Sequence, residues 1–385
     1  MQVYLYAKSG HTVGLEATKR CAAIANVLKE FDPILCTSDF RAGAFAKDLL
    51  GVRRYVNIDV VRNLTNIMEK RDILIYDTPE ANDAMRKDMK EFCTLFYGIG
   101  EEINGIIVDT SIYSKNENPS IEKTIFFGDD DYYNLFLEMT KGSEKLEMNL
   151  LMGHYFFLGN EKIFSNHFSN IIDEEEYVQT IQNSKYLLTA SLQTAFESLA
   201  CGNYPVLFKR VDKDYNEDLI SKINIPLIEA NNLKQLIEDF ELTINNYPII
   251  NNFNITPLDN IANDIRQKID LYKKLTKNGT DTGRVKTYEE LYVDISISET
   301  KKKINQKEKT TTETTTATVE EVPTENGNVR MKDQKNGDEN GFVKLLYHSK
   351  SAYENLRILN SWFFESMVDT TAIADMVDLM KYLFM

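Results

Sequence analysis

A histidine preceded by glycine follows the first apolar segment of the chain. Val3–Ala7 has the character of a buried strand, and residues 8–14 (KSGHTVG) connect it to a helical pattern. Gly10 allows a tight turn there and a close approach of a ligand to the backbone. The imidazole of His11 can act as a general acid or base near neutral pH. The loop lacks the spacing of a P-loop, and a histidine that caps the helix or is simply solvated is the alternative interpretation.

A second candidate site lies in residues 187–207, where two short apolar strands flank a helix. In such a unit the N–H groups at the helix N-terminus face the crevice beyond the strand ends, where anionic ligands bind. Ser191 or Thr194 could donate hydrogen bonds to a diphosphate, and Glu197 could accept hydrogen bonds from ribose hydroxyls. A solvated helix face is the alternative interpretation of the same residues.

Carboxylates follow two further strand candidates. Gly128 closes one of them and could admit a phosphate, but Asp129, Asp130 and Asp131 come next and would repel an anion unless Mg²⁺ bridged them. Capping of the following helix is the commoner use of Asp at this position. Asp77 ends another strand candidate, where strand ends meet a ligand crevice in α/β sheets. Its alternative role is also that of an N-cap.

Strand and helix patterns alternate through most of the chain, which predicts βαβ units and mostly parallel sheets. The strand candidates are Val3–Ala7, Pro33–Thr37, Tyr55–Ile58, Ile73–Tyr76, Thr94–Tyr97, Gly105–Val108, Thr124–Gly128, Leu150–Met152, Tyr155–Leu158, Tyr186–Thr189 and Ile225–Ile228. Helices are predicted at Phe45–Leu50, Asn232–Phe240 and Leu258–Leu275, and one face of another helix is marked between Val13 and Leu28. The fold class is therefore α/β, with two Rossmann-like units.

A change of pattern divides the chain into regions. A polar stretch at 114–120 interrupts the alternation, so we expect one Rossmann-like domain over 1–118 and a second, nucleotide-sugar-binding one over 119–300. Residues 301–341 are rich in Lys and Thr and poor in apolar residues, which predicts a disordered linker. Residues 342–385 regain an amphipathic pattern, and we expect a small helical segment there.

Composition narrows the classes of function. The formal net charge of −15 argues against sequence-independent binding to nucleic acid, which requires basic surface. Four scattered cysteines without CxxC spacing indicate small core residues in a reducing compartment. The sequence shows no leader pattern and no apolar run of the ~18 residues that a transmembrane segment needs. We therefore expect a cytoplasmic protein.

These residues together resemble the MurG-like superfamily of glycosyltransferases with the GT-B fold, and most closely the UDP-sugar hydrolase family of pseudaminic acid biosynthesis. Gly10-His11, Asp77, Phe126–Gly128 and Ser191–Pro205 carry the resemblance. It implies two facing Rossmann-like domains with a cleft between them, and a UDP-linked amino sugar that is hydrolysed or transferred there. It requires neither a cofactor nor a metal.

The resemblance also implies roles for individual residues. His11 would be the general base, assisted by Asp77, and the diphosphate would lie over Gly128 and Ser191, with Thr194 as a further donor. Glu197 would hold the ribose.

The chain departs from the family pattern, and each replacement of a Gly by a larger residue, as at Thr189-Ala190-Ser191, narrows the room beside the diphosphate. Lys8 and Gly14 occupy the outer Gly and Arg positions of the histidine motif, and Asp129–Asp131 add negative charge. The alternative is a catalytically inactive GT-B scaffold whose residues 342–385 recruit a protein partner.

Overall fold

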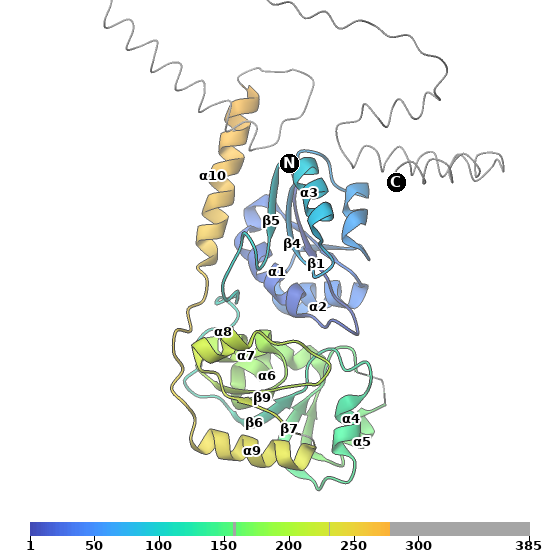
Figure 1. The fold of residues 1–385 in the computed structure, drawn as a ribbon, viewed down its shortest axis with the longest axis vertical. Helices are drawn as coiled ribbons and strands as arrows, with labels where there is room; N and C mark the ends of the chain where they lie inside the picture. Colours follow the sequence, from blue (N-terminus) through green and yellow to red (C-terminus); the bar gives the residue numbers. More distant parts are fainter. Residues whose placement is uncertain (157–158, 231, 278–385) are drawn as a thin grey trace, which may run out of the picture. The chain divides into compact units, whose positions relative to one another are not determined.

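The computed structural model describes residues 1–277 except 157, 158 and 231 (Figure 1). The predicted linker at 301–341 and the predicted helical segment at 342–385 lie outside the described residues. Two parallel sheets with interleaved helices make up the described chain. Both sheets belong to one compact unit, which comprises Met1–Met85 and the described residues from Cys93 onward.

The first sheet has five parallel strands in the order β3-β2-β1-β4-β5. They are β1 (Val3–Ala7), β2 (Ile34–Thr37), β3 (Arg54–Asn57), β4 (Ile73–Asp77) and β5 (Leu95–Gly98). β1 is buried along its whole length, as a central strand covered on both faces must be. Ala7 pairs with Thr37 on one side and with Asp77 on the other. The loops that follow these three strands therefore emerge at the same edge of the sheet.

The helices of the first half are α1 (Glu16–Val27), α2 (Phe40–Leu50) and α3 (Asp83–Phe92), with 3-10 turns at Lys29–Phe31 and Val61–Asn66. α1 buries a face of small and apolar side chains that includes Cys21 and Ile24. α2 begins five residues earlier than its apolar pattern predicts, because Asp39 caps it and accepts hydrogen bonds from two backbone N–H groups.

The second sheet has six parallel strands in the order β11-β10-β9-β6-β7-β8. They are β6 (Ile121–Phe126), β7 (Leu146–Leu151), β8 (Phe168–Ile172), β9 (Ser184–Thr189), β10 (Tyr204–Phe208) and β11 (Leu227–Ile228). In each sheet the chain starts at a central strand, winds outward to one edge and then continues on the other side. This is the doubly wound, Rossmann-like order, which confirms the predicted α/β fold class. The exact boundary at residue 118 stays a prediction.

The helices of the second half are α4 (Leu135–Thr140), α5 (Glu161–Phe164), α6 (Tyr177–Asn183), α7 (Leu192–Ala200), α8 (Glu217–Ile223), α9 (Leu233–Asn245) and α10 (Leu258–Lys277), with a 3-10 turn at Glu174–Glu176. α10 packs against α1 of the first half, and Tyr97 of β5 donates a hydrogen bond to Asp264 of α10 at 3.0 Å. None of the helices in the described part of the chain is both long and apolar enough to cross a bilayer.

Two predicted strands are wrong. Gly105–Val108 is a connection, buried from Ile106 onward, that makes only an isolated bridge, between Ile106 and Ile255. The Ile107 carbonyl accepts a side-chain hydrogen bond from Gln193. Apolar character there reflects burial between elements and not strand pairing. Tyr155, in the predicted strand at 155–158, lies in a turn, because its N–H donates to the Asp129 carbonyl. Residues 157 and 158 are outside the described part.

Phe136 lies at the centre of an aromatic cluster beside the second sheet. Its ring centroid is 4.9 Å from that of Phe127, 5.3 Å from that of Phe164 and 5.7 Å from that of Phe168. All four side chains are essentially inaccessible to solvent, so their dispersion contacts cannot be replaced by contacts with water.

We expect Phe136→Ala to lower the free energy of unfolding by about 3–5 kcal/mol, because it leaves a cavity in a close-packed core. Phe40→Ala is the matched control, since the Phe40 side chain is 66% exposed. Urea denaturation followed by circular dichroism measures both. Equal losses for the two variants would contradict the assignment of this core.

Candidate functional site

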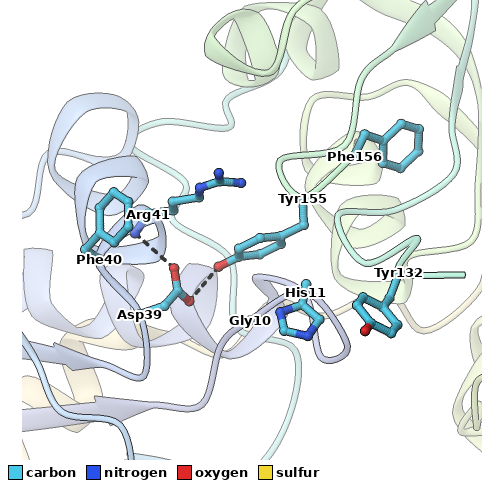
Figure 2. Close-up of a pocket in the computed structure, with 8 residues that line it drawn as sticks. All are labelled: Gly10, His11, Asp39, Phe40, Arg41, Tyr132, Tyr155 and Phe156. Carbon is cyan, nitrogen blue, oxygen red and sulfur yellow. Dashed lines mark hydrogen bonds between the residues drawn. The ribbon is translucent and has the colours of Figure 1, made fainter. Parts of the chain in front are cut away.

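A pocket of about 550 Å³ lies beyond the carboxyl ends of β1, β2, β6 and β7 (Figure 2). Its volume is within the about 300–1,000 Å³ that small-molecule sites occupy. The lining residues are Gly10, His11, Asp39, Phe40, Arg41, Tyr132, Tyr155 and Phe156. The first five of these residues follow strands of the first sheet, and the last three follow strands of the second. Both halves of the unit therefore contribute to this pocket.

The His11 loop is a tight turn built on two glycines. The Gly10 carbonyl accepts hydrogen bonds from the N–H groups of Val13 at 3.0 Å and Gly14 at 2.7 Å. Gly10 has φ +139° and Gly14 has φ +80°, which side-chain-bearing residues rarely adopt. His11 is exposed at the tip, with its ring centroid 4.6 Å from that of Tyr132. Within the described residues the imidazole makes no hydrogen bond, which leaves both ring nitrogens available to a ligand.

Asp39 joins the two halves at the opposite wall of the pocket. One of its carboxylate oxygens accepts the N–H groups of Arg41 and Ala42 at 2.9 and 3.2 Å, and the other accepts the Tyr155 hydroxyl at 2.7 Å. Burial and the neighbouring Asp39 raise the pKa of Tyr155, so the phenol stays a proton donor. Phe40 follows the cap and is largely exposed. This wall was not predicted, although an Asp close behind a strand, as Asp39 is behind Thr37, is a usable signal for a capped helix at a sheet edge.

Asp77 contacts the start of the His11 loop. Its carboxylate accepts a hydrogen bond from Arg20 Nε at 2.7 Å, and its carbonyl accepts the N–H of Lys8 at 3.0 Å. Burial disfavours the charged guanidinium of Arg20, but Asp77 and Glu16 outweigh that effect and raise its pKa. The structure thus brings Asp77 close to the base of the loop and gives its carboxylate a partner other than His11.

The N-terminus of α7 carries the predicted diphosphate donors, and both are buried. Ser191 and Thr194 are 2% and 0% exposed. Ser191 Oγ accepts the Thr194 N–H at 3.2 Å and donates to Glu16 Oε1 of α1 at 2.8 Å. Burial disfavours ionisation of Glu16, but Lys213 and Arg20 outweigh it and hold the pKa of Glu16 below its ordinary value. The Ser191 hydroxyl, which was predicted to bind phosphate, is therefore already bound to the carboxylate of Glu16.

Glu197 is 1% exposed and is held by side chains of its own half. It accepts hydrogen bonds from the Tyr177 hydroxyl at 2.7 Å and from Gln193 Nε2 at 3.2 Å. Burial raises the pKa of Glu197 although Lys19 and Tyr177 favour its charged form. The structure brings Ser191, Thr194 and Glu197 together as predicted by their helical spacing, but their polar groups already have internal partners.

Lys19 of α1, in the first half, contacts α6, α7 and the loop after β6 in the second half. Its ammonium lies 3.0 Å from Asp129 Oδ2, 2.8 Å from the Tyr177 hydroxyl and 3.5 Å from Thr194 Oγ1. It also lies over the Tyr177 ring at 4.0 Å and the Phe126 ring at 5.4 Å. The side chain is 1% exposed. Nothing in the local sequence around Lys19 indicates burial, because all of its partners are distant along the chain.

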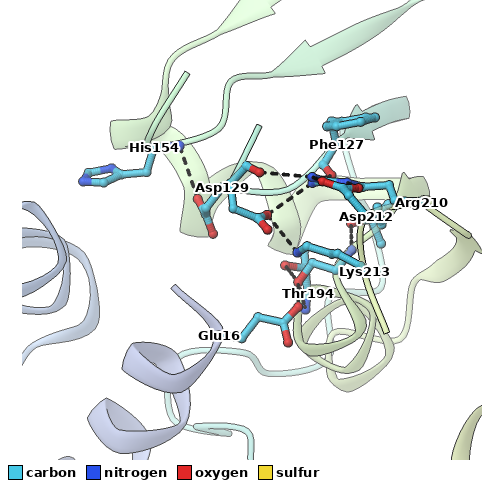
Figure 3. A network of polar contacts seen from close by, with 12 residues as sticks. Glu16, Phe127, Asp129, His154, Thr194, Arg210, Asp212 and Lys213 are labelled. Atoms are coloured by element: carbon cyan, nitrogen blue, oxygen red, sulfur yellow. Dashed lines mark hydrogen bonds and ion pairs between the residues drawn. The ribbon is translucent and has the colours of Figure 1, made fainter. Parts of the chain in front are cut away.

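The three consecutive carboxylates after Gly128 have three different partners. Figure 3 shows the network around Asp129, Arg210 and Lys213. Asp129 binds Lys19, Asp130 pairs with Arg210 at 3.2 Å and Lys213 at 2.8 Å, and Asp131 accepts two N–H groups at the start of α4. The capping interpretation is therefore confirmed for Asp131 only. Within the described part of the chain no cluster of three or more His, Cys, Asp or Glu residues could hold a metal ion.

Gly128 lies against a second loop of the same half. A Cβ on Gly153 would stand 2.2 Å from the Gly128 carbonyl oxygen, so the loops after β6 and β7 touch backbone to backbone. The N–H of His154 also donates to Asp129 at 3.3 Å. This packing fixes Tyr155 at the pocket and leaves Gly128 beside the cations of Arg210 and Lys213.

The fold and pocket define the class: an α/β protein with two Rossmann-like sheets and a pocket of small-molecule size at their strand ends. No protein-family model and no curated protein matches the sequence. Among solved structures, the E. coli heptosyltransferase WaaC with ADP is similar, at 10% identity and a TM-score of 0.36, over 64% of this chain and 98% of that one. The class assignment rests on the strand order and the pocket, not on this weak similarity.

Loss of the Lys19 ammonium should be strongly destabilising. Lys19→Met leaves Asp129 buried without its cation, and removal of one partner of a buried pair costs about 3–5 kcal/mol. Lys123→Met is the matched control, because Lys123 pairs with Glu241 where both side chains are partly exposed, and such pairs contribute little. Chemical denaturation of both variants tests this, and an equally small loss for Lys19→Met would contradict a structural role for its charge.

The Glu16 carboxylate should make stability depend on acid pH. Because the pKa of Glu16 lies below its ordinary value of 4.5 in the folded state, its contribution is present above that pH and is lost as the pH falls through the lowered pKa. We expect the melting temperature of the wild-type protein to exceed that of Glu16→Gln near neutral pH. The difference should disappear on acidification, whereas a pH-independent difference would contradict this origin.

Proposed function

We propose that this protein is an enzyme that acts on a nucleotide-linked sugar in the pocket beside His11. The observation that carries the proposal is the position of His11, at the carboxyl end of a central strand and in a pocket to which both Rossmann-like halves contribute. Doubly wound sheets bind their ligands at this edge. An imidazole there can take a proton from water or from an acceptor hydroxyl.

The reaction in this proposal is hydrolysis or transfer at the sugar carbon that bears the nucleotide. His11 removes the proton of the attacking hydroxyl, whose oxygen bonds to that carbon while the bond from the carbon to the phosphate oxygen breaks and the nucleoside diphosphate leaves. Tyr132 positions the imidazole through ring contact. Asp77 assists by holding the start of the loop, because its carbonyl accepts the Lys8 N–H, while its carboxylate is held by Arg20. A UDP-linked amino sugar is the substrate that the sequence resemblance suggests, and hydrolysis is the reaction of that family.

The nucleotide part requires a rearrangement in this proposal. For a diphosphate to reach Ser191 and Thr194, it must displace Glu16, because the Ser191 hydroxyl now donates to that carboxylate. The cations of Lys213 and Arg210 lie beside Gly128 but are paired with Asp130, so a diphosphate there must displace that carboxylate as well. For a ribose hydroxyl to bind Glu197, the hydrogen bond from the Tyr177 hydroxyl to Glu197 must likewise break.

A non-enzymatic binding module is the second candidate, and the same closed network favours it. Ser191, Thr194 and Glu197 are no more than 2% exposed and are satisfied internally. A chain that no longer binds nucleotide can keep the fold and turn such residues into structural ones. In that case the predicted partner-binding segment at 342–385, which is outside the described residues, would carry the function.

Substitution of His11 tests the catalytic role. We expect His11→Ala to lower turnover of the substrate by about 10²–10⁴-fold, the usual contribution of a general base, with the affinity for UDP unchanged. His167→Ala is the matched control, because the His167 ring contacts Ser143 and does not line the pocket. Full turnover in His11→Ala would remove His11 from the mechanism.

A calorimetric titration with UDP, and separately with ADP, distinguishes the enzyme from the binding module. Micromolar binding that weakens in Glu197→Gln supports an intact nucleotide site, and repetition with Mg²⁺ shows whether a cation assists. Absence of binding at millimolar nucleotide would contradict the proposed enzyme and support the binding module.

A further inference from the structure

Arg41 is the pocket residue whose charge the fold does not use. Its backbone N–H is held by Asp39, but within the described residues its guanidinium has neither a hydrogen bond nor an ion pair. Figure 2 shows this side chain beside the Tyr155 ring, with His11 on the other side of that ring in the same view. The side chain thus faces the pocket with its fork of donors available.

The other charge in the pocket wall does not compete for Arg41. Both oxygens of the Asp39 carboxylate are engaged, one by two backbone N–H groups and one by the Tyr155 hydroxyl. Asp39 also lies at the N-terminus of α2, where the helix dipole compensates negative charge. Lys8, the nearest lysine in sequence to His11, pairs with Glu80. Among the described residues that line the pocket, Arg41 is therefore the cation that remains for a ligand.

Aromatic rings form much of the remaining wall. Phe40 is 66% exposed and Tyr132 is 43% exposed although both border the pocket, and Tyr155 and Phe156 complete the lining. Solvent-exposed rings at a pocket give a flat apolar surface on which the C–H face of a sugar ring can lie. Hydroxyl groups at the edge of such a ring would then reach His11.

We infer that the pocket binds an anionic sugar, whose carboxylate or phosphate pairs with Arg41 while a ring hydroxyl faces His11. The planar guanidinium matches both oxyanions with two parallel hydrogen bonds, so the shared chemistry is an oxyanion on a sugar ring. The inference rests on the proposed function for the identity of the ligand as a sugar, and it names the class of sugar that the site takes.

Three hexoses that differ only at carbon 6 test this inference: glucose, glucuronate and glucose 6-phosphate. Their affinities for the full chain can be measured by saturation-transfer NMR. We expect at least one of the two anions to bind about tenfold more tightly than glucose, the scale of a charge-assisted hydrogen bond. The better of the two anions identifies carboxylate or phosphate as the preferred group.

Arg41→Met should remove the preference for the anion while weak binding of glucose remains. Arg54→Met is the matched control, because Arg54 pairs with Asp32 at the amino end of β3, away from the pocket. Equal affinity for all three sugars, or a preference that survives in Arg41→Met, would overturn the inference.

The outcome is separable from that of the proposed function. Anion preference through Arg41 without turnover of any nucleotide-linked sugar would contradict the enzyme and support the anionic-sugar site. Turnover that depends on His11, without the anion preference, would support the enzyme and contradict the anionic-sugar site.

Discussion

The buried ammonium of Lys19 is the constraint on which the described structure depends. A lysine that is removed from water must meet oxygen partners and aromatic faces, or the fold bears a cost of several kcal/mol. Lys19 belongs to α1 of the first half, whereas Asp129, Tyr177 and Thr194 belong to the second half. The charges of Lys19 and Asp129 are paired only when the two halves hold one arrangement, whereas Tyr177 and Thr194 also bond to each other within the second half. Glu16, one turn earlier on α1, adds its contact with Ser191 on the same side.

This constraint divides the functional surface into a closed part and an open part. At the N-terminus of α7, the side chains of both halves meet one another and exclude solvent. Beyond β1, β2, β6 and β7, the Asp39–Tyr155 contact holds the halves together and a pocket remains. In the proposed function, the chemistry that needs access to solvent and ligand is therefore assigned to His11 and Arg41. The polar residues around Lys19 are buried and contact one another.

Local pattern was sufficient to predict the parallel sheets. Val3–Ala7 and Ile73–Asp77 are apolar runs of strand length between helical patterns, and burial of central strands requires such runs. Local pattern failed at Gly105–Val108, where an equally apolar run is buried as a connection because Gln193 and Thr256 use its carbonyl groups. An apolar run signals burial, and it specifies a strand only when a neighbour is available to pair with it.

The candidate site was predictable only in part, for the same physical reason. The turn at Gly10 and the placement of His11 follow from local residues. Lys19 and Tyr155 could not be found in this way, because their partners Asp129 and Asp39 are more than a hundred residues away. The three aspartates after Gly128 were recognisable as a group of charges, but their separate partners are set by tertiary structure.

The central claim is that a nucleotide-linked sugar binds in the pocket beside His11. Hydrogen–deuterium exchange of the full chain, with and without millimolar UDP-N-acetylglucosamine, tests that claim most directly. The account predicts slower exchange in the segments 9–14, 38–42 and 129–133, which carry the pocket residues. Unchanged exchange in all three segments at saturating ligand would contradict it.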